Sequence, residues 1–198
     1  MNRPIRALIP GARGALLDAM ICAGHELSTA QAARVAGVSG PQASRVLAQL
    51  VELGIVRRRE VPPAVVYAPV ESNLVVAMLR DLCNLRDRVI WVAVNAANSI
   101  TPRPTVLSLY GSVARGTSDA DSDIDVVAVR PDGADNDDTW VESLDRWRVV
   151  VQNASGNPVN IIDLTEEEWR ARDLSSGTLW HEIDRDAVLL LSPSRVPA

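Results

Sequence analysis

A short stretch of the chain combines residue types that bind phosphate and metal ions. The apolar run 105–110 ends in Gly111 and Ser112, and Asp123 and Asp125 stand at the start of a second apolar run. Glycine lets the backbone approach a phosphate closely, and a serine at the start of a helical turn adds its hydroxyl to free N–H groups. Two aspartates two residues apart on a strand project from one face, about 6 to 7 Å apart. This order predicts a site for a polyphosphate and a divalent cation.

Two further residues extend this candidate site. Gly116 can end the turn that starts at Ser112 by adopting the left-handed conformation. Asp163 interrupts a later apolar run, where a charge is costly unless it is coordinated, so we expect it to be a third metal ligand on a neighbouring strand. Together with Asp123 and Asp125 it can hold two Mg²⁺ ions roughly 3.5 to 4 Å apart, which bridge a triphosphate.

These residues resemble the nucleotidyltransferase superfamily of the DNA polymerase β type and, within it, the minimal nucleotidyltransferases of prokaryotes. The glycine-serine turn, the Asp-x-Asp pair and the later aspartate carry the resemblance, which covers about residues 100–192. It implies a small α/β domain with a mixed sheet, an NTP substrate and in-line attack of an acceptor hydroxyl on the α-phosphate. The products are pyrophosphate and an acceptor that carries a nucleoside monophosphate.

The resemblance also implies a role for each site residue. Asp123 and Asp125 bind the metal ions, and Asp163 binds the catalytic metal and helps to deprotonate the acceptor hydroxyl. Gly111 and Ser112 hold the β and γ phosphates, and Arg115 is a further phosphate contact, although helix N-termini and metal ions could suffice in its place. With Gly116 at the end of the turn, these residues form the expected nucleotide-binding set.

The N-terminal part of the chain predicts three helices followed by a hairpin. Apolar residues recur at helical spacing, and Ser28 and Ser39 each precede a glutamine by three residues, as in a capping box. Gly37 allows a tight turn between the second and third helices. The segments 55–60 and 64–70 then predict two strands joined by a short turn.

This pattern resembles the winged helix-turn-helix domains of bacterial transcription regulators over about residues 10–70. The resemblance implies that the third helix enters the major groove of operator DNA and that the wing contacts phosphate. Winged helices also dimerise or dock proteins, and the wing arginines could instead form a charged strand edge that prevents mispairing. The expected DNA-binding residues are Gln42, Ser44 and Arg45 on the third helix and Arg57, Arg58 and Arg59 by the wing.

Charge and periodicity divide the chain into three parts. Residues 1–70 hold eight arginines and four acidic residues, a balance of +4, whereas residues 71–198 hold twelve and twenty-one, a balance of −9. Apolar positions between residues 71 and 99 keep a helical spacing, which predicts one connecting helix that could pair with a second copy as a homodimer. We therefore expect an α+β chain with an all-α winged helix-turn-helix domain (1–70), a connecting helix (71–100) and a nucleotidyltransferase domain (101–198).

Two features bear on the compartment in which the protein works. Cys22 and Cys83 are isolated in the sequence, so we expect two small buried thiols, not a disulfide framework or a metal site. The start of the chain lacks the apolar stretch of a secretory signal, and no apolar run approaches the roughly 18 to 20 residues of a bilayer span. These features favour a cytoplasmic protein without membrane contact.

Three functions are compatible with these resemblances. Few residues follow Asp163 to form an acceptor pocket, which favours an acceptor with a large surface of its own. Minimal nucleotidyltransferases include antitoxins that adenylylate a partner toxin, so the first expectation is an ATP-dependent antitoxin that transfers AMP to a toxin and binds operator DNA. The alternatives are a DNA-binding regulator with a nucleotide-sensing or inactive transferase domain, and an antibiotic nucleotidyltransferase.

Overall fold

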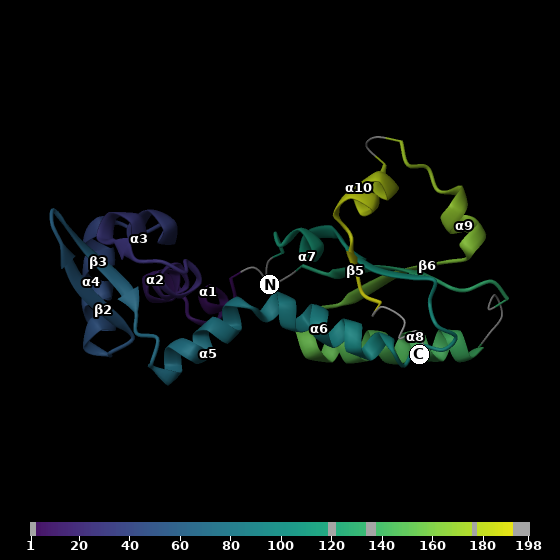
Figure 1. The fold of residues 1–198 in the computed structure, drawn as a ribbon, viewed down its shortest axis with the longest axis horizontal. Helices are drawn as coiled ribbons and strands as arrows, with labels where there is room; N and C mark the ends of the chain where they lie inside the picture. The colour runs from purple at the N-terminus through teal and green to yellow at the C-terminus, as the bar shows by residue number, and fades with distance from the viewer. Residues whose placement is uncertain (1–2, 119–121, 134–137, 176–177, 192–198) are drawn as a thin grey trace, which may run out of the picture. The chain divides into compact units, whose positions relative to one another are not determined.

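The chain forms two compact units, shown in the computed structural model of Figure 1. One unit comprises Arg3–Leu85 and the other begins at Arg86, so the expected connecting segment 71–100 is divided between them. The structure describes residues 3–118, 122–133, 138–175 and 178–191. Within these residues, no helix is both long enough and apolar enough to cross a membrane.

The first unit contains the predicted helix-turn-helix. Ser28 accepts a hydrogen bond from the N–H of Gln31, and the Gln31 side chain accepts one from the N–H of Ser28, which completes the expected capping box. Ser39 caps the next helix through its hydroxyl, and Gly37 adopts a φ of 70° in the turn between them. The helices of this region are α1 (Pro4–Leu8), α2 (Gly11–Cys22), α3 (Thr29–Ala36) and α4 (Gly40–Glu52).

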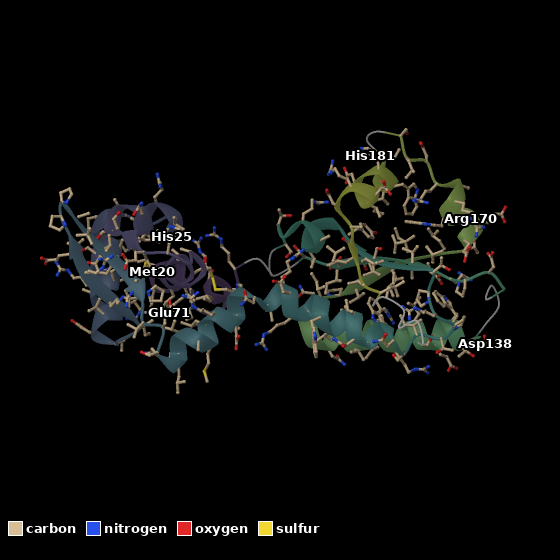
Figure 2. All side chains as sticks on the ribbon, in the orientation of Figure 1. Met20, His25, Glu71, Asp138, Arg170 and His181 are labelled. Atoms are coloured by element: carbon tan, nitrogen blue, oxygen red, sulfur yellow. A yellow bond between two sulfur atoms is a disulfide. The ribbon has the colours of Figure 1, made fainter. Side chains whose placement is uncertain are left out.

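The wing is part of a three-stranded antiparallel sheet. Strands β2 (Val56–Val61) and β3 (Ala64–Pro69) form the expected hairpin, and β1 (Leu27–Ser28) pairs with the other edge of β3. Val56 of this sheet joins the buried core of the unit, which includes Met20 of α2 (Figure 2). The helices and the wing therefore share one core.

The two cysteines form a disulfide, visible as a yellow bond in Figure 2. Cys22 ends α2, Cys83 ends α5 (Leu74–Cys83), and their Cα atoms are 5.9 Å apart. Helix α5 reaches α2 because Val76 is buried in the core of the N-terminal unit. The expectation of two free thiols is therefore wrong, since the pairing depends on helix packing across 61 residues of sequence.

The helix expected between residues 71 and 99 is two helices. Helix α5 ends before Asn84, whose N–H bonds back into the last turn, and α6 (Leu85–Ala97) follows. Val76 of α5 is buried in the N-terminal core, whereas Ala93 of α6 is buried in the core of the second unit. The apolar spacing therefore comes from two shorter apolar faces that pack in different cores, and the expectation of a single helix is wrong. Dimerisation through residues 71–100 stays a prediction.

The second unit is built on a four-stranded mixed sheet, as expected. Its strand order is β6-β5-β4-β7, in which β5 and β6 are parallel and the other two pairs are antiparallel. The strands are β4 (Val106–Tyr110), β5 (Ile124–Val129), β6 (Val159–Leu164) and β7 (Val188–Leu189).

Helices cover both faces of this sheet (Figure 1). Helices α6 and α8 (Asp138–Ser155) pack on one face, and α9 (Glu166–Ala171) and α10 (Leu179–Asp186) lie over the other. Successive residues of β5 separate accordingly, since Val126 joins the core under α8 and Val127 joins the core under α10. Alternate residues of each strand therefore point to opposite faces of the sheet.

Opening the disulfide should destabilise the N-terminal unit alone. A cross-link between residues 61 apart lowers the entropy of the unfolded chain, and the chain-entropy model gives about 4 kcal/mol at 25 °C. Guanidinium unfolding of the oxidised chain and of the Cys22→Ser/Cys83→Ser variant, followed by circular dichroism, measures this difference. All five tryptophans lie in the second unit, so the transition in their fluorescence is an internal control that should not move. An equal shift of both transitions would contradict this expectation.

Candidate functional site

A glycine turn and an aspartate from the adjacent strand meet at the centre of the site. Strand β4 ends at Tyr110, and the chain turns directly into the short helix α7 (Gly111–Arg115), which Gly116 ends at a φ of 69°. Gly111 has a φ of 75°, and a Cβ at this position would lie 2.7 Å from Oδ2 of Asp125. Glycine is therefore needed here both for its backbone conformation and for the close approach of the carboxylate.

One side-chain amide holds the two carboxylates of the Asp-x-Asp pair together. Nδ2 of Asn160 donates to Oδ2 of Asp123 at 3.1 Å and to Oδ1 of Asp125 at 3.3 Å. Strands β5 and β6 are parallel, and their register sets Asn160 beside Asp125. The structure thus brings Asp123 and Asp125 together, and the third residue at this point is an asparagine.

Asp163 does not join this cluster. It lies three residues after Asn160 on β6, beside Ala128, and residues three apart on a strand point to opposite faces. Its carboxylate accepts two hydrogen bonds from Arg130, at 3.2 and 3.1 Å, and one from Nε1 of Trp140 at 3.1 Å. The guanidinium of Arg130 offsets its charge, and Asp163 faces away from Asp123 and Asp125, so the expectation that it is the third metal ligand is wrong.

Among the described residues, the donors at this point are two carboxylates and one amide. Asp123 and Asp125 supply carboxylate oxygens, which hard cations prefer, and rotation of the Asn160 amide would turn its oxygen toward the same point. Among the residues that the structure describes, no three His, Cys, Asp or Glu side chains form a metal-binding group. The cage of three aspartates expected around two Mg²⁺ ions is therefore not formed.

Two other side chains lie at the ends of the turn. Burial, followed by the charge of its register partner Asp125, raises the pKa of Tyr110. At the other end, Nη1 of Arg115 lies 4.0 Å from Oδ2 of Asp186 on α10. The pKa of Asp186 is lowered by its hydrogen bond with Arg185 and by the charges of both arginines. The phosphate contact expected of Arg115 stays a prediction.

The third helix of the winged-helix unit presents the residues expected to read DNA. Ser44 and Arg45 are exposed on α4, and Gln42 is half-buried. A hollow of about 350 Å³ at the start of α4 is lined by Ser39, Pro41, Gln42 and Arg45. A base edge or a phosphate could enter it, so this surface is compatible with the expected contacts.

The wing arginines are exposed, and each has an acidic neighbour. Glu26 lies 3.9 Å from Arg57 and also pairs with Arg59, while Arg58 lies 2.9 Å from Glu60. The hydrogen bond from Arg59 lowers the pKa of Glu26. Exposed ion pairs are weak, so a DNA phosphate could replace these carboxylates, and phosphate contact by the wing arginines stays a prediction.

Asn160 is the site residue that the sequence analysis missed. It is the second residue of β6, as Asp125 is the second residue of β5, and parallel strands begin at the same edge of a sheet. Position within the strand was therefore the usable signal. The charge of Asp163 within an apolar run suggested a metal ligand, but this charge is offset by Arg130.

Two family models match the chain. Residues 9–64 match the model of the MarR family, and residues 94–179 match that of the nucleotidyltransferase domain. The chain therefore carries a MarR-type winged-helix domain followed by a nucleotidyltransferase domain, which confirms both resemblances. No curated protein matches the chain significantly in sequence.

Several solved structures are similar to parts of the chain. A toxin-antitoxin crystallised with AMP-PNP is 18% identical, with a TM-score of 0.37, over 53% of this chain and 74% of that chain. A Sulfolobus solfataricus protein described as a nucleotidyltransferase is 24% identical, with a TM-score of 0.31, over 54% and 82%. An Escherichia coli protein described as a DNA-binding transcriptional regulator is 17% identical, with a TM-score of 0.32, over 40% and 85%.

Replacing Gly111 with alanine should disrupt the site more than its φ alone explains. The new Cβ would clash with Asp125, and an alanine at a φ of 75° is strained by about 1 to 2 kcal/mol in itself. Gly156→Ala is the matched control, because Gly156 has the same φ and open space around its Cβ position. Chemical unfolding followed by tryptophan fluorescence should show the larger loss for Gly111→Ala. Equal losses would mean that the approach of Asp125 imposes no constraint.

Proposed function

We propose that the chain is a DNA-binding regulator whose nucleotidyltransferase domain binds a magnesium–nucleoside triphosphate, ATP first among the candidates, and senses it. Asn160 carries this proposal, because it stands beside the Asp-x-Asp pair where a third carboxylate was expected. Gly111 and Ser112 would bind the phosphates, and Asp123 and Asp125 would hold the cation. When bound, Mg²⁺ would neutralise charge on the phosphates.

The neutral amide of Asn160, beside the two aspartates, supports sensing over transfer. Attack of an acceptor hydroxyl on the α-phosphate requires removal of its proton, which a carboxylate can accept and a neutral amide cannot. Asp163 has the right chemistry, but it lies on the opposite face and accepts hydrogen bonds from Arg130 and Trp140. We therefore expect the site to bind a nucleotide but to deprotonate an acceptor hydroxyl poorly.

A second candidate is transfer of a nucleoside monophosphate to a macromolecular acceptor, such as a partner toxin. The close packing of Gly111 on Asp125 and the convergence of Asp123 with Asp125 favour it, since these are the parts that hold the reacting phosphates. A water molecule or a group on the acceptor would then have to remove the proton. Both candidates share nucleotide binding and differ in the fate of the α-phosphate.

Binding and transfer can be separated by variants on the two faces of the sheet. Asp125→Asn should weaken Mg–ATP binding, measured by calorimetry, by about tenfold or more because one of two ligating carboxylates is lost. Asp163→Asn removes a carboxylate of the same strand pair from the opposite face and should leave the affinity unchanged. Asn160→Asp supplies a carboxylate as proton acceptor, so with water as the acceptor it should raise hydrolysis of ATP to AMP and pyrophosphate by roughly 100-fold over the wild type.

The outcomes distinguish the candidates without knowledge of the acceptor. Wild-type protein that releases pyrophosphate as fast as Asn160→Asp, or that labels a neighbouring gene's product or tRNA from α-labelled ATP, would replace sensing by transfer. Loss of affinity in Asp163→Asn equal to that in Asp125→Asn would place the nucleotide elsewhere. If Mg–ATP does not bind the wild type at all, both candidates fail.

The DNA-binding part of the proposal has its own test. Arg45→Ala should weaken binding to a duplex from upstream of the chain's own gene by about 1 to 3 kcal/mol, because Arg45 is exposed at the start of α4. Arg80→Ala, on α5, is the control and should bind as the wild type does. Fluorescence anisotropy at a fixed salt concentration measures both. A winged helix that docks protein would show no affinity for this duplex above that for unrelated DNA.

A further inference from the structure

We propose that Arg86 is a positioning residue for the nucleotide site, and that it acts by holding helix α7 in place. This inference rests on the proposed binding of phosphate at the first turn of α7. Nε of Arg86 donates to the carbonyl of Val113 at 2.7 Å, and Nη2 donates to the carbonyl of Ala114 at 2.6 Å. Both contacts are partly buried, and both acceptors belong to α7.

These contacts provide hydrogen-bond donors for carbonyl groups of α7 that so short a helix leaves without partners. The last carbonyls of a helix have no partner within it, and a helix of five residues consists largely of such ends. The N–H of Gly116 reaches the carbonyls of Ser112 and Val113. The carbonyl of Ala114 accepts its hydrogen bond from Arg86, 28 residues away in the sequence.

The chemistry of the guanidinium makes this contact directional. Its N–H groups form a rigid planar fork, so two hydrogen bonds to successive carbonyls fix the orientation of the helix end as well as its position. A positive charge at the C-terminal end of a helix also stabilises the helix dipole. A lysine would keep the charge at this end and lose the fork.

Arg86 is itself anchored on a rigid element. It is the second residue of α6, and α6 is buried through Ala93 and Ala97 in the core that also contains Val113 of α7. Nη1 of Arg86 lies 3.1 Å from Oδ1 of Asp87, which helps to set the direction of the side chain. The contact therefore ties the end of α7 to the framework of the same unit.

Helix α7 is consequently held at both ends. Gly111 packs against Asp125 at its start, and Arg86 grips its last carbonyls. Five residues span about 7 Å, so a shift at one end moves the N–H groups at the other. Arg86 contacts carbonyl groups of Val113 and Ala114, and helix carbonyls point away from the N-terminal N–H groups. It would therefore act on phosphate binding through the helix without touching the nucleotide.

Substitution of Arg86 should weaken nucleotide binding and leave the carboxylates intact. Arg86→Met in the full chain should bind Mg–ATP about tenfold more weakly, the equivalent of one charge-assisted hydrogen bond. Arg86→Lys should fall between Arg86→Met and the wild type. Arg146→Met is the matched control, because Arg146 is an exposed arginine of α8 in the same unit, and it should not change the affinity.

A second readout separates positioning from general loosening of the fold. Mn²⁺ alone, measured by electron paramagnetic resonance, should bind Arg86→Met as tightly as the wild type, since its ligands lie on and beside β5, not on α7. Unchanged Mg–ATP affinity in Arg86→Met, or an equal loss of Mn²⁺ and Mg–ATP, would overturn the inference. If Asp125→Asn also leaves Mg–ATP affinity unchanged, the proposed function fails as well. If only Arg86→Met is silent, the proposed function stands without this inference.

Discussion

The parallel pairing of β5 with β6 is the constraint on which the candidate site depends. Its register brings the amide of Asn160 to Asp123 and Asp125 and directs Asp163 to the opposite face. There Arg130 forms a paired hydrogen bond with Asp163 and offsets its charge. A slip of one residue would exchange the faces of β6, and the buried apolar residues on both sides oppose it.

Around this register, short elements are held by contacts with residues far away in sequence. Helix α7 depends on Asp125 at one end and on Arg86 at the other. The winged-helix unit has a separate core and a disulfide at the end of α5. Only Asn84 and Leu85 separate Cys83 from Arg86, so the chain connects the disulfide to the contact with α7 within three residues.

Features that depend on neighbours in sequence could be predicted. The capping box at Ser28, the left-handed Gly37 and the wing hairpin follow from propensity, capping and alternation. The mixed sheet, in contrast, was implied by the resemblance to nucleotidyltransferases. The apolar periodicity between residues 71 and 99 was misleading. It shows that one face of a helix is apolar, but it does not show in which core that face is buried. The apolar spacing of α5 continues along the sequence into α6, so the two helices resembled a single one.

The sequence by itself determined the glycine-serine turn, the aspartate pair and the capping boxes, which together indicated the two domains, since each of these motifs is formed by residues within about a dozen positions of one another. Only the tertiary structure decided which side chains meet: Asn160 with the aspartates 35 and 37 residues earlier, Asp163 with an arginine 33 residues away, and two cysteines 61 residues apart. Strand register and helix packing set these pairings, and both arise from burial of the whole apolar surface, which no local pattern contains.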